Sequence, residues 1–260
     1  MILKTHRWGP QKPNGVVCVH GIAQHGGVFA ALGERLAAAD RSVLAVDLRG
    51  HGDSGKEPPW NTETHVDDVL ETLDAQGIER VSWVGHSFGG RVAAALADRA
   101  GERTDALALL DPAIEVDPEQ ALRSAEIERL DWSFATVEGA INALLSSEAM
   151  IEPPQDVIRE YAQRDVRKGP DGRYRFRFSP SAVVTAWNEV TLPAVPVAKV
   201  PTLLVVATVS LAGVSAKKER FREALGDLLT DVVVPNGHNV LWEAPEETIS
   251  AIEEFLDRVA

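Results

Sequence analysis

The segment Gly85-His86-Ser87-Phe88-Gly89 constrains the fold of this chain more than any other stretch of its sequence. An apolar run at 81–85, typical of a buried strand, leads into it, and an Ala-rich stretch at 88–100, typical of a helix, follows it. A G-x-S-x-G pattern between a strand and a helix indicates a sharp turn that exposes the serine hydroxyl at the end of a sheet. The sequence therefore predicts Ser87 as a nucleophile at the start of a helix, where free N–H groups face developing negative charge.

The rest of the chain predicts an α/β fold with a mostly parallel central sheet flanked by helices. Short apolar runs alternate with helical patterns, as in βαβ units, and most runs are continuously apolar, which is typical of strands covered on both faces. Residues 2–8 are expected to add an antiparallel edge strand. The other strands are expected at 16–20, 42–47, 81–85, 106–110, 203–207 and 232–234, and the helices at 29–39, 67–76, 88–100, 217–225 and 246–259.

One long interval interrupts this alternation. About 90 residues separate the strand that ends near Leu110 from the strand that starts near Leu203, and so long an interval is an insertion with its own structure rather than a loop. Helix-like patterns lie at 118–130, 136–147 and 155–167. We expect a helical lid (a cap) over the carboxyl end of the sheet, inserted after the sixth strand. The expected division is a core of residues 1–114 and 197–260 and a lid of residues 115–196.

Composition narrows the class of protein and its partners. The 260 residues, 45% apolar and 25% charged, are typical of a soluble globular protein. The net charge of −13 argues against nucleic acid and anionic membranes as partners. Cys18 is the only cysteine, lies in an apolar run, and is expected to be a buried, inert thiol. Neither a signal peptide nor a membrane span is visible, so a cytoplasmic location is expected, and the sequence leaves the oligomeric state open.

His238 is the candidate general base. It lies in Pro235-Asn236-Gly237-His238-Asn239, directly after the last expected strand, where a loop histidine can reach over the sheet and take the serine proton. Of the seven histidines only His238 lies beyond His86 in the chain. His86 is expected to face away from the nucleophile and to be structural or to line the substrate pocket. His6, His25 and His65 are expected at the surface or at the pocket rim.

Four motifs together resemble the α/β-hydrolase family. His20-Gly21 follows one strand, Asp47-Leu48-Arg49-Gly50-His51-Gly52-Asp53-Ser54 follows the next, and Gly85-His86-Ser87-Phe88-Gly89-Gly90 and Gly237-His238 come after them in the family's order. The likeness covers nearly the whole chain and is to lid-bearing serine esterases and lipases. The resemblance implies an oxyanion hole made by the backbone N–H groups of Ile22 and Phe88, and a structural turn at 49–54.

In such relatives an acidic residue completes a catalytic triad with the serine and the histidine, and this chain departs from many of them in the position of that acid. They carry an Asp after the strand that follows the lid, whereas residues 207–215 hold no carboxylate and Glu219 falls inside an expected helix. Asp111 directly follows the strand at 106–110, a position that supplies the acid in some members of the family. We therefore expect a Ser87-His238-Asp111 triad. The alternative is that Asp111 merely caps its strand and that a Ser87-His238 dyad is aided by Ser210 or by water.

The lid carries aromatic and basic residues whose role the sequence leaves open. Trp132, Tyr161 and Trp187, with Phe134, either line an apolar substrate pocket or form the core of the lid itself. Residues 173–178 alternate Arg with Tyr or Phe, so rings and guanidinium groups are expected on opposite faces. The guanidinium face is expected to be solvated, and the alternative is an inward Arg that holds a carboxylate substrate.

A serine at the turn favours acyl transfer through an acyl-serine that water then hydrolyses. We expect a carboxylesterase-like serine hydrolase acting on a small or medium carboxylic ester or a lactone. The alternatives are hydrolysis of a C–C bond in a diketone-type metabolite, a cofactor-free haloperoxidase activity that would use the same residues, or a non-catalytic ligand sensor. The chain shows no HExxH motif, no paired cysteine ligands and no phosphate-binding glycine loop, so neither a metal nor a cofactor is expected.

Overall fold

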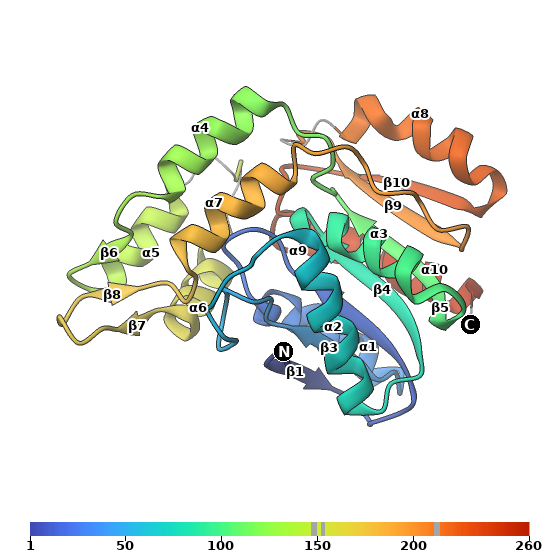
Figure 1. The fold of residues 1–260 in the computed structure, drawn as a ribbon, viewed down its shortest axis with the longest axis horizontal. Helices are drawn as coiled ribbons and strands as arrows, with labels where there is room; N and C mark the ends of the chain where they lie inside the picture. Colours follow the sequence, from blue (N-terminus) through green and yellow to red (C-terminus); the bar gives the residue numbers. More distant parts are fainter. Residues whose placement is uncertain (147–149, 152–153, 211–213, 260) are drawn as a thin grey trace.

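The fold is built on one seven-stranded sheet (Figure 1). In the computed structural model, residues 1–146, 150–151, 154–210 and 214–259 are described. The strand order is β1-β3-β2-β4-β5-β9-β10; β1 is antiparallel to β3, and every other neighbouring pair is parallel. The strands are β1 (Thr5–Trp8), β2 (Asn14–Val19), β3 (Val43–Val46), β4 (Arg80–His86), β5 (Thr104–Leu110), β9 (Thr202–Ala207) and β10 (Leu229–Val234). The predicted mostly parallel α/β sheet and its antiparallel edge strand are confirmed.

Helices cover both faces of this sheet, which explains why its strands are continuously apolar. The helices α2 (Thr62–Gln76), α3 (Phe88–Ala100) and α8 (Val214–Leu225) contribute to the hydrophobic core on one face. On the other face α1 (Ala30–Ala38) and α10 (Pro245–Val259) do the same. All four residues of β3 and all six of β9 are buried between these layers, and so is the free thiol of Cys18, as predicted.

Capping residues set the ends of α2. The side chain of Asn61 accepts a hydrogen bond from the Thr64 N–H, and Gly77 ends the helix in the left-handed conformation with φ 67°. The helix therefore begins at Thr62, five residues before the predicted start. Four short elements were not predicted, because each is too short to show a period of apolar residues in the sequence. They are the 3-10 turns η1 (Gly26–Phe29), η2 (Gly101–Arg103) and η3 (Gly226–Leu228) and the four-residue helix α9 (Val240–Glu243).

The insertion between β5 and β9 combines helices with a small sheet. The helices α4, α5 and α6 match the three predicted ones, and the predicted end of α5 at residue 147 lies outside the described residues. The helix α7 was not predicted. Its first turn contains Pro180, at a position where proline is tolerated. The strands β6, β7 and β8 form an antiparallel sheet in the order β6-β8-β7. The elements are α4 (Pro118–Glu128), β6 (Ser133–Phe134), α5 (Val137–Leu145), α6 (Gln155–Asp165), β7 (Arg167–Lys168), β8 (Tyr174–Arg175) and α7 (Pro180–Glu189).

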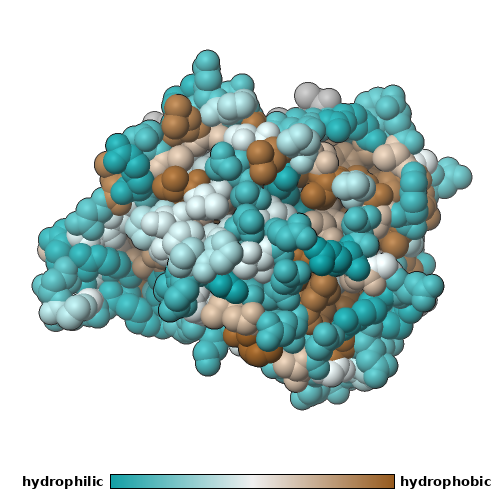
Figure 2. Space-filling view, in the orientation of Figure 1, coloured by the Kyte–Doolittle hydropathy of each residue, from teal (hydrophilic) through white to brown (hydrophobic). Residues whose placement is uncertain are grey.

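The insertion follows β5, the fifth strand of the sheet, and not a sixth. The expected position was wrong by one strand: the five strands expected before the insertion correspond to β1 to β5, and residues 1–13, all described, hold no further strand. Figure 1 shows α4, α5, α6 and α7 gathered on one side of the sheet, with α4 and α7 next to each other. Figure 2 shows the molecule in the same orientation, with a mostly hydrophilic surface and apolar side chains exposed over α4. The exposed apolar residues of α4 are Leu122 and Ile127.

Candidate active site

Ser87 lies at a strained turn between β4 and α3. Its backbone has φ 54° and ψ −121°, in a region that non-glycine residues rarely adopt. A Cβ on Gly85 would collide with the carbonyl oxygen of Gly89, and a Cβ on Gly89 would collide with that of Val19. The glycines on both sides of Ser87 are therefore required by the close packing of β2, β4 and α3 at the sharp turn that the pattern predicted.

A chain of hydrogen bonds links Ser87 to His238 and Asp111. The Oγ of Ser87 lies 2.8 Å from Nε2 of His238, and Nδ1 of His238 lies 2.6 Å from Oδ2 of Asp111. Ser87 follows β4, Asp111 follows β5 and His238 follows β10, so each residue lies at the carboxyl end of its strand. Because parallel strands end at the same edge of a sheet, three residues far apart in the sequence meet there.

Asp111 is held by donors from the segment that follows β9. Its Oδ1 accepts a hydrogen bond of 3.1 Å from the Ala207 N–H, and its Oδ2 accepts one of 2.8 Å from the Ser210 hydroxyl. The Asp111 side chain is fully buried, and its backbone φ is 39°. Asp111 and Ser210, which the sequence left as alternatives, thus belong to one hydrogen-bonded chain. Residues 211–213 of the same segment lie outside the described residues.

One predicted oxyanion donor directly follows Ser87 in the chain, and the other lies in the loop after β2. Phe88 is the first residue of α3, and the first N–H groups of a helix have no partner within it. Ile22 lines the same cavity as Ser87. The loop that carries Ile22 is braced by Gln24, whose Oε1 accepts a hydrogen bond of 3.1 Å from the Gly21 N–H and whose Nε2 donates to Asn239.

His86 supports the loop that carries His238. Its Nε2 donates to the backbone carbonyl of His238 over 2.9 Å, and burial together with the nearby His238 lowers its pKa to about 3. A neutral His86 therefore has a structural role and also lines the cavity at Ser87. His25 and His65 are buried, so their expected place at the surface or pocket rim was wrong. Their imidazoles pack against Tyr161 and Phe88, long-range contacts that the local sequence does not indicate.

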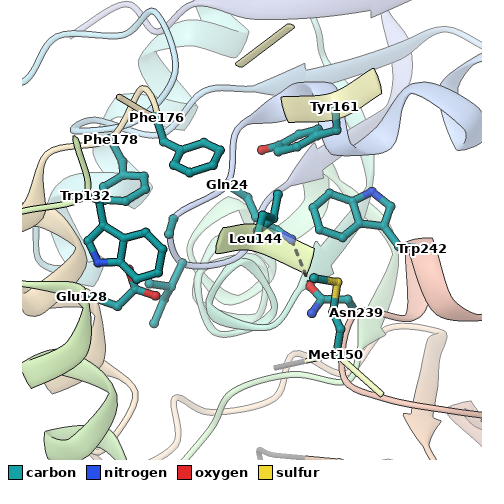
Figure 3. Close-up of a pocket in the computed structure, with 12 residues that line it drawn as sticks. Gln24, Glu128, Trp132, Leu144, Met150, Tyr161, Phe176, Phe178, Asn239 and Trp242 are labelled. Atoms are coloured by element: carbon teal, nitrogen blue, oxygen red, sulfur yellow. Dashed lines mark hydrogen bonds between the residues drawn. The ribbon is translucent and has the colours of Figure 1, made fainter. Parts of the chain in front are cut away.

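One cavity opens at the serine, and a second cavity adjoins it. The cavity at Ser87 has a volume of about 110 Å³ and is lined by His86, His238, Trp187 and Gln120, among others. The second has a volume of about 120 Å³ and is lined by aromatic residues of the insertion and the core (Figure 3). The two share four lining residues, Ile22, Gln24, Glu128 and Asn239. Glu128 was not predicted from the sequence, because nothing in a helical pattern distinguishes one glutamate that faces a cavity.

Three of the four aromatic residues singled out in the lid line these cavities, whereas Phe134 lines neither and packs against Trp132 and Phe176. Trp132 and Tyr161 line the aromatic cavity, and Trp187 lines the cavity at Ser87. No Arg or Lys is found among the described residues that line either cavity. The arginines bind other groups: Arg173 donates to Ser133, Arg175 pairs with Asp171, and Arg177 pairs with Asp53 and Asp165. The guanidinium of Arg177, only 9% exposed, is thus turned inward to Asp165 and Asp53 and not to either cavity, so the expected solvated face is wrong for this residue.

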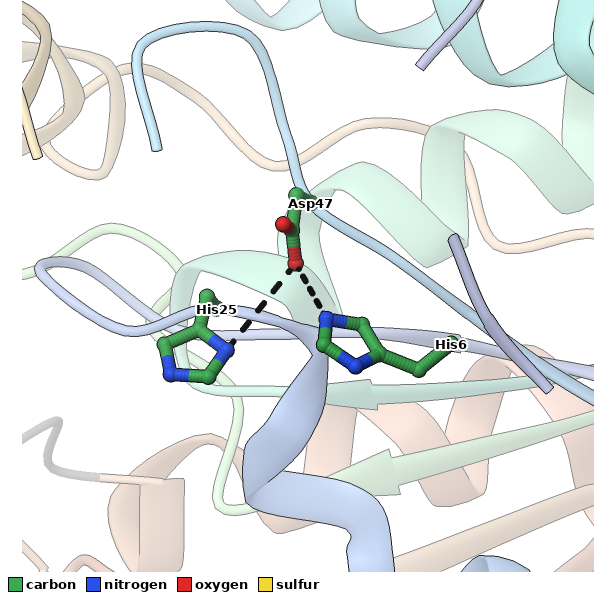
Figure 4. A group of neighbouring side chains, drawn as sticks. All are labelled: His6, His25 and Asp47. Atoms are coloured by element: carbon green, nitrogen blue, oxygen red, sulfur yellow. Dashed lines mark hydrogen bonds and ion pairs between the residues drawn. The ribbon is translucent and has the colours of Figure 1, made fainter. Parts of the chain in front are cut away.

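His6, His25 and Asp47 form a second cluster of titratable groups (Figure 4). The atoms that could bind a metal ion already have protein partners: Oδ1 of Asp47 accepts from the Gly26 N–H and from Nε2 of His6, and Nδ1 of His25 accepts from the Gly27 N–H. Burial would raise the pKa of Asp47, but the hydrogen bonds from His6 and the Asp53 N–H hold it well below its usual range. The cluster fits a network that fastens the turn after β3, and it does not fit a metal centre.

Comparison with known proteins is consistent with this geometry. The family model described as the alpha/beta hydrolase fold matches residues 14–245. This chain belongs to the α/β-hydrolase fold family. Its relatives in the family include lipases and esterases.

Two curated relatives and one solved structure are especially similar to the chain. Lipase LipV of Mycobacterium tuberculosis is 34% identical over 83% of this chain and 83% of its own length. Esterase YbfF of Escherichia coli is 28% identical over 93% of this chain and 92% of its own length. The crystal structure of E-2-(acetamidomethylene)succinate hydrolase superposes with a TM-score of 0.84 at 26% identity, over 98% of this chain and 95% of that one.

None of the described helices combines the length and the apolar character that crossing a bilayer requires.

Proposed function

We propose that this α/β hydrolase is a carboxylesterase-like serine hydrolase that cleaves a small or medium carboxylic ester, or a lactone, through an acyl-serine intermediate. The observation that carries the proposal is the continuous chain of hydrogen bonds from Ser87 through His238 to Asp111, with Ser87 opening into a cavity. The names of the relatives LipV and YbfF, a lipase and an esterase, support ester hydrolysis in particular.

In the proposed acylation step, Nε2 of His238 takes the proton of the Ser87 hydroxyl as Oγ attacks the carbonyl carbon. The N–H groups of Ile22 and Phe88 stabilise the oxyanion of the tetrahedral intermediate, and each such donor contributes about 2.7–4 kcal/mol in other hydrolases. The C–O bond then breaks, and His238 returns the proton to the leaving alkoxide, which departs as an alcohol.

Deacylation repeats these steps with water. His238 takes a proton from the water as its oxygen attacks the acyl carbon, and the proton then passes to Oγ of Ser87 as the carboxylic acid leaves. Asp111 accepts the Nδ1–H of His238 throughout, which selects the tautomer whose Nε2 is free to take a proton, and it stabilises the imidazolium. The hydroxyl of Ser210 and the N–H of Ala207 keep the Asp111 carboxylate in place.

We further propose that residues 115–196 act as a lid on a core of residues 1–114 and 197–260. Trp132, Tyr161 and Trp187 would then be substrate-binding residues contributed by the lid, together with His86 from the core. Buried polar contacts fasten the lid to the core: Glu189 accepts hydrogen bonds from the backbone and hydroxyl of Thr62, and Arg91 donates to the carbonyls of Leu192 and Pro193.

A series of p-nitrophenyl esters from acetate to decanoate tests the proposal on the wild type and on Ser87→Ala. We expect turnover by the wild type, loss of turnover in the variant, and a fluorophosphonate adduct on Ser87 detected by mass spectrometry. The chain-length optimum would report the size of the two cavities. Unchanged turnover in Ser87→Ala would refute Ser87 as the nucleophile. A Ser87 adduct without turnover of any ester would refute the esterase and favour a C–C bond hydrolase or a ligand sensor.

A further inference from the structure

Glu128 is a carboxylate at the junction of the two cavities that has no partner among the described residues. It is the last residue of α4 and is among the residues that line both cavities. It makes no hydrogen bond or ion pair with any other described residue, whereas its neighbour Glu126 pairs with Arg129 on the outer surface of the same helix. Figure 3 shows the Glu128 side chain next to the indole of Trp132, at the edge of the cavity.

The local environment of Glu128 disfavours an ionised carboxylate. The carboxyl end of a helix carries the negative end of the helix dipole, which destabilises a nearby anion. Burial also raises the pKa of Glu128 to about 7. Residues that conflict with their local environment and lack a protein partner are expected mainly at functional sites, because a bound ligand can supply the missing interaction.

The remaining lining of the second cavity is suited to a positively charged organic group. Trp132, Phe176 and Phe178 lie on one side of the cavity, and Tyr161 and Trp242 lie on the other (Figure 3). Aromatic faces attract substituted ammonium groups through cation–π interactions, and such cavities recognise quaternary ammonium ligands in other proteins. Among the described lining residues of both cavities Glu128 is the only carboxylate, and no cationic Lys or Arg competes for it.

We propose that the two cavities select an ester whose acyl or alcohol part carries a substituted ammonium group, with the ester carbonyl at Ser87 and the ammonium between Glu128 and the aromatic rings. This inference rests on the proposed function and names its substrate class. Glu128 is then a specificity-determining residue, and an anionic group in the same place is rejected because it would face a carboxylate. The net charge of −13 adds a long-range attraction for cationic substrates.

The test compares cationic esters with neutral esters of the same shape. On the acyl side the pair is p-nitrophenyl 4-(trimethylammonio)butyrate and p-nitrophenyl 5,5-dimethylhexanoate. On the alcohol side it is 2-(trimethylammonio)ethyl butyrate and 3,3-dimethylbutyl butyrate. In each pair a quaternary carbon replaces the quaternary nitrogen, so the ratio of the two kcat/KM values reports the effect of the charge. Rates are measured at pH 8 by nitrophenol release or by titration of the acid.

We expect the wild type to prefer the cationic ester over its isostere by at least about tenfold in one of the two pairs. Glu128→Gln, which keeps the shape and removes the charge, should bring that ratio to within about threefold of unity, and Trp132→Leu should lower it as well. Glu126→Gln, an exposed residue of the same helix, is the matched control and should retain the wild-type ratio.

Three outcomes would overturn the inference in distinguishable ways. If the neutral esters are turned over and the ratio of cationic to neutral kcat/KM is near or below one in both pairs, the ammonium preference is refuted and the proposed esterase stays intact. A preference for the cation that survives in Glu128→Gln would refute the role of Glu128. Failure to hydrolyse any of the four esters would refute the proposed function and the inference together.

Discussion

Nδ1 of His238 and Oδ2 of Asp111 lie 2.6 Å apart although 127 residues separate them in the chain. The whole insertion and the strand β9 lie between them in sequence, and the two residues meet because β5 and β10 end at the same edge of the sheet. Asp111 is fully buried, so its carboxylate depends on the donors around it, which are His238, Ser210 and the Ala207 N–H.

Asp111→Asn should reduce kcat by several orders of magnitude. The amide can present a donor to Nδ1, which favours the wrong tautomer of His238, and the corresponding change in a serine protease costs about 10⁴-fold. Steady-state hydrolysis of a neutral p-nitrophenyl ester measures the loss, and circular dichroism checks that the fold is retained. A loss of less than about tenfold would show that Asp111 is not the acid.

Ser210→Ala separates the two ways in which Ser210 can be involved. If Ser210 only helps to hold Asp111, its removal should lower kcat by about tenfold, the typical loss of one hydrogen bond to a charged group. In the Asp111→Asn background, removal of the Ser210 hydroxyl should then have little further effect, because the two residues act as a unit. Additive losses in the double variant would instead assign Ser210 an independent role.

The sequence was sufficient for much of the fold because the decisive signals are local. Continuous apolar runs mark the buried strands, and Gly85 and Gly89 mark the turn at Ser87, since close packing there excludes a side chain. Ser87, Asp111 and His238 are predicted to converge because each of them follows a strand and these strands are parallel. Their catalytic roles remain predictions until the variants are measured.

Features that depend on the position of the insertion could not be predicted. Glu128 differs from Glu126 only in which side of α4 it occupies relative to the core, and that depends on how the insertion packs. The same holds for His25, whose burial depends on Tyr161 of α6, more than a hundred residues away. Polar residues in a local pattern carry no signal of the long-range partner that buries them.

Gly89→Ala should destabilise the protein even though alanine normally favours a helix. A Cβ at this position collides with the backbone of Val19 on β2, and overpacking of this kind typically costs about 1–3 kcal/mol in the free energy of unfolding. Gly139→Ala in α5 is the control, because a Cβ there meets only ordinary contacts and should stabilise the helix by up to about 1 kcal/mol. Urea unfolding measures both; an unchanged midpoint for Gly89→Ala would contradict the packing argument.

Arg177→Ala should loosen the proposed lid. The guanidinium of Arg177 lies 2.9 Å from the buried carboxylate of Asp165 within the insertion and 2.7 Å from Asp53 of the core. Its removal leaves Asp165 buried without its cation, a type of change that costs about 3–5 kcal/mol. Arg164→Ala, which breaks an exposed pair with Glu160, is the control and should cost less than about 1 kcal/mol. Thermal unfolding and limited proteolysis of residues 115–196 provide the measurements, and equal effects of the two variants would argue against an anchoring role.

The raised pKa of Glu128 predicts a pH-dependent stability that one substitution should remove. Burial raises the pKa of this carboxyl to about 7 in the folded protein, above the ordinary value of 4.5 that applies in the unfolded chain. Its contribution to stability is therefore fully present below pH 4.5 and is lost as the pH rises to about 7, because the unfolded chain releases the proton more readily. Glu128→Gln resembles the protonated form at every pH. We expect the variant to unfold at a higher temperature than the wild type at pH 8 and the difference to shrink at pH 4.5.

Neighbouring titrations should not obscure this difference. Burial lowers the pKa of His86 to about 3 and raises that of Tyr161 well above 10, so neither group changes charge between pH 4.5 and pH 8. His238, which also lines the cavity, is present in both proteins. Glu126→Gln supplies the control for a carboxyl that is exposed and paired. A Glu128→Gln melting temperature that tracks the wild type at all pH values would show that the carboxyl is solvated, and would remove the physical basis for a cation-binding role.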